Sequence, residues 1–373
     1  MRSELARFDS LSHGTIYRTK SGLQGYYPRV VRLSERELLA SFVAGTAVET
    51  PDSHPVLSRS TDGGVSWALQ GPVDANRPPK FAPTETGFIS QDFDGTLMCL
   101  GGRWLVDPES PDLPLVNPKT SGMRDNQIVL RRSSDGGRSW KPAEILPKPR
   151  PTPLELPTGM MALPDARNGL SCTTWPGWNG AGLYGHRVLF VTSADRCKTW
   201  GEPVPVFQDT SDRIGYWEAR ITPIPEGGLL ATCWAHDQSS DKDLPNHFAV
   251  SRDGGKRWTA PMPTPVMGQT GWPLWLGGDR VLFVYNHRRS PVGVRAQIAQ
   301  LDDTTWTTLY DAEIWSPQVQ TESSISKHDY AVTSFQFGAP SAIRLDEGII
   351  MVIYWCVTEG RAGINWSRIQ LYL

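Results

Sequence analysis

The sequence lacks the apolar segments that would place a chain in or across a membrane. Its longest nearly unbroken apolar run, Ile349–Val357, is far shorter than the ~18–20 residues that span a bilayer. The opening stretch MRSELARFDS contains no apolar core of the kind that a secretory signal requires. We therefore expect a cytoplasmic protein without membrane contact, with a secreted protein whose signal was removed as the alternative.

An excess of one charge and a cysteine framework are missing as well. The 37 Lys and Arg residues nearly balance the 39 Asp and Glu residues, which leaves no basic footprint for a nucleic-acid backbone. Five cysteines cannot all pair, and none stands in a CxxC spacing. We expect reduced thiols, no metal site, no cofactor and no nucleic-acid partner, and the oligomeric state stays open.

Tryptophan is abundant, with 15 residues, and part of this abundance belongs to a repeat. Three segments share the pattern S-x-D-G-G-x-x-W, and a fourth, degenerate copy has Cys197 in place of the second glycine. The copies occupy residues 60–67, 133–140, 193–200 and 251–258, and Asp303–Trp306 is a candidate fifth copy. A period of about 60 residues fits six times into this chain.

The repeat has a physical explanation as a turn between two strands. The Asp carboxylate accepts hydrogen bonds from nearby backbone N–H groups, and the glycines permit positive φ angles. The Trp then begins the next strand and packs between sheets. Short β-forming runs precede each turn, and long amphipathic helices are absent. The sequence therefore predicts an all-β fold, a six-bladed β-propeller of four-stranded antiparallel blades.

Four cysteines follow the same period. Cys99, Cys172, Cys233 and Cys356 fall in or at the end of the expected second strand of successive repeats. A reduced cysteine behaves as a small buried hydrophobe, so we expect these residues to be structural.

The pattern S-x-D-x-G-x-[ST]-W is the Asp-box, or bacterial neuraminidase repeat, and the chain resembles the sialidase superfamily of six-bladed propellers along nearly its whole length. We place the blades at residues 24–74, 80–147, 152–206, 213–264, 270–310 and 334–373. Residues 14–19 are expected to add a strand to the last blade, and residues 1–373 to form one propeller domain. The resemblance implies peripheral repeat turns and a ligand site near the central axis.

Sialidases place an arginine triad, a Tyr/Glu nucleophile pair and an acid/base aspartate at this axis. The resemblance maps the glutamate onto Glu218, at the start of blade 4. Tyr26 stands where the first arginine is expected, and Arg29 follows the next proline. Ala339 stands where the nucleophilic tyrosine is expected. The chain therefore looks like a sialidase-superfamily propeller that is not a sialidase.

Two further catalytic roles of the family map less directly. The acid/base aspartate corresponds approximately to Asp52, with Glu49 as a rival in the same loop. The third arginine corresponds to Arg288 or Arg295.

The expected starts of first strands and ends of second strands supply aromatic and polar side chains that suit a carbohydrate. Aromatic rings stack on sugar C–H faces, and polar groups fix hydroxyls. The predicted substrate-binding residues are Tyr26, Arg29, His54, Arg103, Arg124, Trp178, His186, Trp234, Arg288, Gln336 and Arg361.

The leading hypothesis is a glycoside hydrolase that acts on the terminus of an oligosaccharide or glycoconjugate, acidic sugars included. Glu218 and Asp52 form the predicted acid/base pair, assisted by His236 or His287. Without the family's tyrosine, inversion is the favoured stereochemical outcome.

Two alternatives remain at this stage. One is a lyase that acts on a uronate with a His or Tyr base, and the other is a non-catalytic carbohydrate-binding propeller. A metal held by His236, His247 and Asp237 would match no known zinc spacing.

Overall fold

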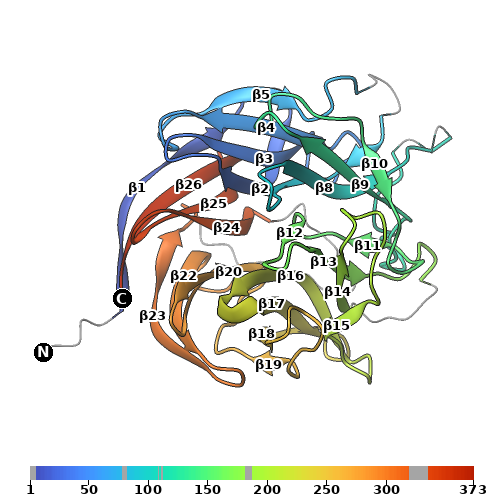
Figure 1. Cartoon of the computed structure of the whole chain (residues 1–373). Helices are drawn as coiled ribbons and strands as arrows, with labels where there is room; N and C mark the ends of the chain where they lie inside the picture. The colour runs from blue at the N-terminus through green and yellow to red at the C-terminus, as the bar shows by residue number, and fades with distance from the viewer. Residues whose placement is uncertain (1–5, 78–81, 108, 111, 181–186, 319–334) are drawn as a thin grey trace, which may run out of the picture.

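Six antiparallel β-sheets radiate from a central axis (Figure 1). The structure is a computed structural model, and it describes residues 6–77, 82–107, 109–110, 112–180, 187–318 and 335–373. Four sheets contain four strands each, and two contain five because their first strand is split into two pieces. The six-bladed propeller predicted from the repeats is confirmed.

Blades 1 to 3 follow one another along the first part of the chain. Blade 1 consists of β2 (Gln24–Arg32), β3 (Leu38–Gly45), β4 (His54–Ser60) and β5 (Ala68–Pro72). Blade 2 consists of β6 (Thr84–Glu85), β7 (Phe88–Gln91), β8 (Leu97–Trp104), β9 (Gln127–Ser133) and β10 (Glu144–Leu146). Blade 3 consists of β11 (Leu154–Glu155), β12 (Met161–Ala162), β13 (Asn168–Thr174), β14 (Val188–Ser193) and β15 (Val204–Phe207).

Blades 4 to 6 complete the ring. Blade 4 consists of β16 (Ile214–Ile224), β17 (Gly228–Asp237), β18 (Lys242–Ser251) and β19 (Met262–Pro263). Blade 5 consists of β20 (Gly271–Gly277), β21 (Arg280–His287), β22 (Gly293–Leu301) and β23 (Trp306–Trp315). Blade 6 consists of β24 (Phe337–Asp346), β25 (Ile349–Thr358), β26 (Arg361–Tyr372) and β1 (Arg7–Tyr17).

The first strand of the chain closes the ring, because β1 pairs with β26 at the outer edge of blade 6 (Figure 1). This strand begins at Arg7, well before the predicted residues 14–19. The outer strand of blade 5 likewise runs to Trp315, beyond the predicted end at residue 310. The described residues contain one helical element, the 3-10 turn η1 (Pro225–Gly227). No helix in this part of the chain is long and apolar enough to cross a membrane.

The hydrophobic core lies between the blades. One cluster joins residues of blade 1, such as Phe42, to residues of blade 6, such as Ile353. Strands β3 and β17 are buried along their entire length, because each is covered on both faces by neighbouring blades. The four cysteines predicted to be structural lie buried in β8, β13, β17 and β25, as expected.

The repeat turns have the predicted chemistry. The Asp62 carboxylate accepts hydrogen bonds from the backbone N–H groups of Val65 at 3.0 Å and Ser66 at 2.9 Å. Gly64 has φ +90°, and a Cβ there would lie 2.6 Å from Met351 Cε of blade 6. The turn therefore requires glycine both for its backbone conformation and for close packing of the neighbouring blade.

Candidate active site

The first strands of three blades share one irregularity at the axis. The pairing register shifts between Tyr26 and Arg29 in β2, between Trp217 and Arg220 in β16, and between Gly338 and Ser341 in β24. Each of these bulges contains one non-glycine residue with positive φ. These residues are Tyr27 (φ 53°), Glu218 (φ 52°) and Ala339 (φ 45°).

Positive φ is uncommon for such residues, and a bulge redirects the side chain that it carries. All three residues line the same central pocket. The propeller therefore presents a tyrosine, a glutamate and an alanine to the axis by the same local device.

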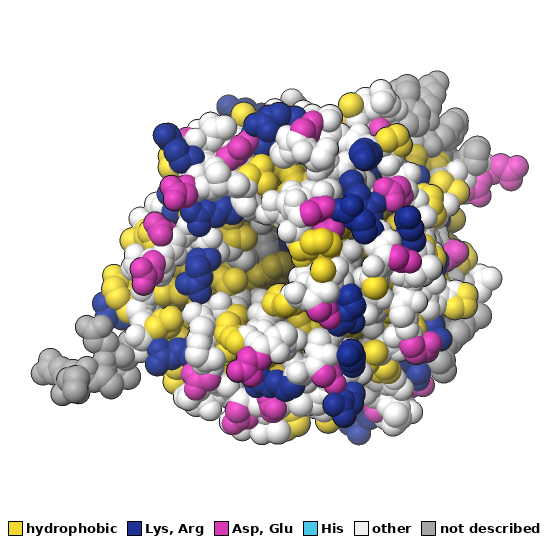
Figure 2. Space-filling view, in the orientation of Figure 1, with side chains coloured by type: hydrophobic (Ala, Val, Ile, Leu, Met, Phe, Trp, Pro, Cys, Tyr) yellow, Lys and Arg dark blue, Asp and Glu magenta, His cyan; other side chains and the backbone are white. Residues whose placement is uncertain are grey.

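The axial pocket has a volume of about 180 Å³. Figure 2 shows the molecule hollowed at its centre, with hydrophobic side chains within the hollow. One side of the lining, the aromatic wall, is formed by Trp217, Trp234, Phe335 and Trp355. Another part, the aliphatic wall, is formed by Val48, Leu115, Val116 and Met123.

The aliphatic wall depends on the long connection between β8 and β9. Leu115 and Met123 of this connection pack with Trp104 and Trp175 in a buried cluster. The lining is thus strongly apolar, which suits a ligand that offers C–H faces to aromatic rings.

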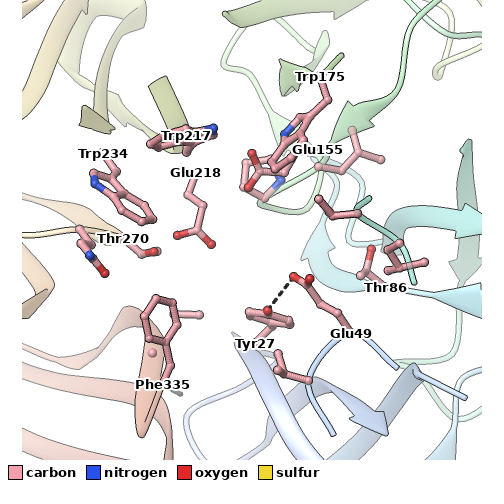
Figure 3. Close-up of a pocket in the computed structure, with 18 of the residues that line it drawn as sticks. Tyr27, Glu49, Thr86, Glu155, Trp175, Trp217, Glu218, Trp234, Thr270 and Phe335 are labelled. Carbon is pink, nitrogen blue, oxygen red and sulfur yellow. Dashed lines mark hydrogen bonds between the residues drawn. The ribbon is translucent and has the colours of Figure 1, made fainter. Parts of the chain in front are cut away.

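Three carboxyl groups reach into the pocket from three different blades. Figure 3 shows Glu49, Glu155 and Glu218 directed toward one central space. Glu49 lies in the loop between β3 and β4, Glu155 ends the short strand β11, and Glu218 occupies the bulge of β16. Tyr27 donates a hydrogen bond from its hydroxyl to Glu49 Oε1 at 3.0 Å.

The surroundings of the three carboxyls raise their pKa values to different extents. Burial, reinforced by the charge of Glu218, raises the pKa of Glu155 to about 8 against the opposing effect of Arg220. Burial raises the pKa of Glu49 to about 7, although the hydrogen bond from Tyr27 lowers it. Near neutral pH, Glu155 is therefore mostly protonated and Glu49 is divided between its two forms.

Glu218 differs from the other two carboxyls because arginines surround it. Burial raises its pKa, and the nearby charges of Arg220, Arg288 and Arg29 oppose that rise. Arg220 also donates from Nη1 to the backbone carbonyl of Glu218 at 3.0 Å. The pKa of Glu218 remains raised, but among the three pocket carboxyls Glu218 is the one whose ionised form the most arginines support.

The three arginines are themselves deeply buried. Arg288 donates from Nε to Gln269 Oε1 at 2.7 Å, and its guanidinium lies 3.6 Å from the centroid of the Phe335 ring. Arg29 donates to the backbone carbonyls of Pro28 at 2.7 Å and Pro157 at 2.9 Å. Arg220 and Arg288 line the pocket, whereas Arg29 lies behind its lining.

A buried polar network supports the aromatic wall. Asp243 accepts hydrogen bonds from Trp234 Nε1 at 2.9 Å and Gln269 Nε2 at 3.3 Å, and its Oδ1 lies 3.1 Å from His236 Nδ1. The other ring nitrogen of His236 lies 3.2 Å from Asp241 Oδ1. Burial lowers the pKa of His236, but the two aspartates outweigh this effect and leave it raised.

No protein-family model matches this chain, and no curated protein matches it in sequence. Solved structures do match. A protein of unknown function from Dyadobacter fermentans superposes with a TM-score of 0.75 at 20% identity, over 98% of this chain and 99% of that one. An α-L-arabinanase from Penicillium chrysogenum, solved with arabinobiose, gives 0.65 at 17% identity, over 97% and 98%.

The NanB sialidase from Streptococcus pneumoniae matches with a TM-score of 0.62 at 13% identity, over 96% of this chain and 70% of that one. This chain has a sialidase-like propeller fold. At these identities the similarity shows the fold alone. The chemistry of the site has to be argued from the residues of this chain.

This sialidase-like propeller brings four of the residues predicted from the sequence into its pocket. They are Glu218, Trp234, His236 and Arg288. Two others lie directly behind the lining: Arg29, as described, and Tyr26, whose ring packs edge-on against Trp355 at 5.2 Å.

The structure does not bring Asp52 to the pocket lining. Its carboxylate accepts hydrogen bonds from Thr46 Oγ1 at 2.6 Å and Thr50 Oγ1 at 2.5 Å. Burial raises the pKa of Asp52, but these bonds outweigh it and leave the pKa lowered. Asp52 therefore organises its own loop, and its rival Glu49 is the residue of that loop that lines the pocket.

Two other histidines of the predicted site, His54 and His287, have described positions and also lie outside the pocket lining. His54 Nδ1 lies 2.8 Å from the carbonyl oxygen of Asp52, beside a separate small cavity. His287 Nδ1 lies 2.8 Å from the carbonyl oxygen of Pro291. The predicted contact residue His186 lies outside the described residues.

Five further predicted contacts do not line the pocket, and four of them hold loops and strands together instead. Arg103 pairs with Glu85 at 2.5 Å, and Arg124 donates to the carbonyl of Leu113 at 3.1 Å. The carbonyl of Trp178 accepts a hydrogen bond from Asn117 Nδ2 at 3.0 Å. Arg361 donates to the carbonyl of Thr19 at 3.1 Å, and Gln336 is exposed.

Several pocket residues were absent from the predicted set. Tyr27, in the bulge of β2, and Glu155, at the end of the short strand β11, both belong to the inner first strands of their blades, so the strand pattern contained a signal for both. Gln269, Thr270 and Phe335 lie in connections between strands, where the repeat carries no positional information.

Proposed function

We propose that this chain is a glycoside hydrolase that cleaves a terminal sugar bound in the axial pocket, with Glu155 and Glu218 as its catalytic carboxyls. The observation that carries the proposal is the pair itself. Two partly buried carboxyls from neighbouring blades share an aromatic pocket. Desolvation raises the pKa of both, to about 8 for Glu155, but the charges of three arginines oppose the rise at Glu218, so the two pKa values are pushed apart. Such a division marks the acid and the base of a two-carboxyl mechanism.

Glu155 is suited to be the general acid. Its pKa of about 8 keeps its proton available near neutral pH, and this proton passes to the glycosidic oxygen as the bond to the leaving group breaks. The resulting Glu155 carboxylate forms near Arg220, whose charge favours it.

Glu218 is suited to be the ionised partner. Its carboxylate either attacks the anomeric carbon or removes a proton from an attacking water, according to the distance between the two carboxyls. Ala339, at the equivalent bulge of blade 6, provides no nucleophile. Glu218 therefore replaces the tyrosine chemistry that the sialidase resemblance implies.

Glu49 and Tyr27 form a third polar group on the pocket surface. The Tyr27 hydroxyl is oriented by its hydrogen bond to Glu49, so this pair presents oxygen atoms that suit a sugar hydroxyl. Arg288 also lines the pocket, and its Nη1 is buried without a hydrogen-bond partner among the described residues. A hydroxyl or carboxylate of the substrate would satisfy it.

The arabinanase and the sialidase that share this fold are named for the cleavage of glycosidic bonds. This supports hydrolysis over the alternatives. A lyase requires a base that accepts a proton near neutral pH. His236 does not fit this role, since Asp243 and Asp241 favour its protonated form.

The proposal is tested with a panel of 4-nitrophenyl glycosides that includes arabinofuranosides, sialosides and uronides. We expect hydrolysis of one or more members, and NMR of the first-formed product gives the stereochemistry. Glu218→Gln should abolish turnover. Glu155→Gln should retain activity on 4-nitrophenyl substrates, whose leaving group needs little acid assistance, and lose it on natural linkages.

The matched control is Asp52→Asn, a carboxylate of the same face that lies outside the pocket lining. Full turnover in both Glu218→Gln and Glu155→Gln would refute the proposed roles. An unsaturated product that absorbs in the ultraviolet would show a lyase. Sugar binding without turnover of any glycoside would show a binding protein.

A further inference from the structure

Three residues of the pocket lining, Trp234, His236 and Gln269, meet on the buried carboxylate of Asp243. Asp243 Oδ1 is shared by Trp234 Nε1 at 2.9 Å and His236 Nδ1 at 3.1 Å. Asp243 Oδ2 is shared by Gln269 Nε2 at 3.3 Å and Arg289 Nη2 at 3.1 Å. The Asp243 side chain is only 1% exposed and does not itself line the pocket.

The hairpin of β17 and β18 explains this convergence. His236 and Asp243 are direct cross-strand partners, and Trp234 lies two residues before His236. Residues two apart in a strand point to the same face, so both side chains meet the Asp243 carboxylate. Gln269 then extends the contact to Arg288, which bonds Gln269 Oε1 at 2.7 Å.

We propose that Asp243 is a positioning residue that sets the orientation of Trp234, His236 and Gln269 in the lining of the axial pocket. Its effect on catalysis rests on the proposed function, whereas its effect on the geometry of the wall does not. Through Gln269 it also fixes Arg288, one of the arginines beside Glu218.

The chemistry of the carboxylate explains why this position needs aspartate. An ionised carboxylate is purely an acceptor, and here its two oxygens face four donor groups. Asparagine has the same size but replaces one acceptor oxygen by an NH₂ donor. Asp243→Asn therefore leaves two of the four groups facing a donor instead of an acceptor.

Asp241 provides a matched control on the same hairpin. It contacts His236 Nε2 at 3.2 Å, and no hydrogen bond joins it to Trp234 or Gln269 among the described contacts. The charged groups that face His236 are thus Asp241 and Asp243, and Arg289 lies on the far side of Asp243. From β16, the Trp217 ring packs against the His236 ring with the two centroids 5.2 Å apart.

The experiment compares wild type, Asp243→Asn and Asp241→Asn by NMR, without any substrate. The indole N–H signal of Trp234 is assigned with Trp234→Phe, and the imidazole signals of His236 with His236→Gln. We expect Asp243→Asn to shift the Trp234 indole proton upfield and to lower the pKa of His236. Asp241→Asn should lower the pKa of His236 and, at a pH low enough to keep His236 protonated in all three proteins, leave the Trp234 signal in place.

A second measurement keeps the test valid if Asp243→Asn does not fold. Since Trp234 and His236 share one oxygen of Asp243, the Trp234 indole signal of the wild-type protein should follow the titration of His236. An indole signal that ignores this titration would overturn the proposal. So would an unchanged Trp234 signal in folded Asp243→Asn.

Kinetics with a glycoside identified by the panel complete the test. We expect Asp243→Asn to raise KM about tenfold or more, with a smaller change in kcat, because the wall holds the sugar while the carboxyls do the chemistry. Unchanged KM together with a shifted Trp234 signal would refute the catalytic part alone. Failure of the whole panel in wild type would refute the proposed function and leave the NMR result standing.

Discussion

Replacing Glu155 by Gln should remove a pH dependence of stability that the buried carboxyl creates. Burial and the charge of Glu218 raise the pKa of Glu155 from 4.5 to about 8. Between these values the folded protein binds more protons at this site than the unfolded chain does. The free energy of unfolding therefore falls as pH rises from the unfolded pKa through the folded pKa.

The magnitude follows from the two pKa values. The interval from 4.5 to about 8 corresponds to at most about 5 kcal/mol at ~1.36 kcal/mol per pH unit. Glutamine does not titrate, so Glu155→Gln lacks this contribution. Glu49, whose pKa is raised to about 7, contributes in the same sense and remains in the variant. The free energy of unfolding of Glu155→Gln should therefore still decline as pH rises, but less than that of wild type.

The assay is urea unfolding followed by tryptophan fluorescence at about pH 5 and about pH 8, where the protonation states of Glu155 differ most. The control is Glu226→Gln, an exposed carboxyl on η1 of blade 4. An equal difference between the two pH values in wild type and Glu155→Gln would refute the assignment of a protonated, buried Glu155.

Three further predictions follow from the same geometry. Asp52→Asn should keep full turnover, measured on any hydrolysed glycoside, and lose about 1–3 kcal/mol of unfolding free energy because its loop hydrogen bonds weaken. Gly64→Ala should destabilise by ~1–3 kcal/mol more than Gly71→Ala in urea unfolding, since both have positive φ but only Gly64 is closely packed. In wild type, kcat/KM on a natural glycosidic linkage should fall about tenfold per pH unit above about pH 8, and a constant rate on that linkage would contradict Glu155 as the acid.

The fold was predictable because its signal is local chemistry repeated along the chain. Each S-x-D turn satisfies its own backbone N–H groups through its aspartate, so the motif is readable without knowledge of the distant contacts. The ends of edge strands were less predictable. Strand β1 begins at Arg7, and its pairing with β26 depends on a partner more than 300 residues away in sequence.

The site was predictable where strands, or the positions directly after them, place the side chains. Glu218, Trp234 and His236 stand on strands of blade 4, and their positions follow from the strand pattern. The prediction that Asp52 lies in the pocket was wrong because hydroxyl groups of its own loop donate hydrogen bonds to its carboxylate. The sequence does not reveal whether a loop carboxylate points into a pocket or accepts hydrogen bonds within its own loop. The choice between Asp52 and Glu49 was therefore a question of tertiary geometry.

The three equivalent bulges explain how one scaffold can present different side chains at its axis. Each bulge holds a residue at positive φ, a conformation that costs of order 1–3 kcal/mol and persists only where surrounding structure enforces it. In blade 6 the bulge delivers Ala339, which has no functional group. In blades 1 and 4 it delivers Tyr27 and Glu218 to the same pocket. The backbone thus presents three positions to the axis, and the residues that occupy them decide which groups reach the pocket. Here Glu218 places a carboxylate near Glu155, and blade 6 contributes Ala339 where the sialidase resemblance expects a tyrosine.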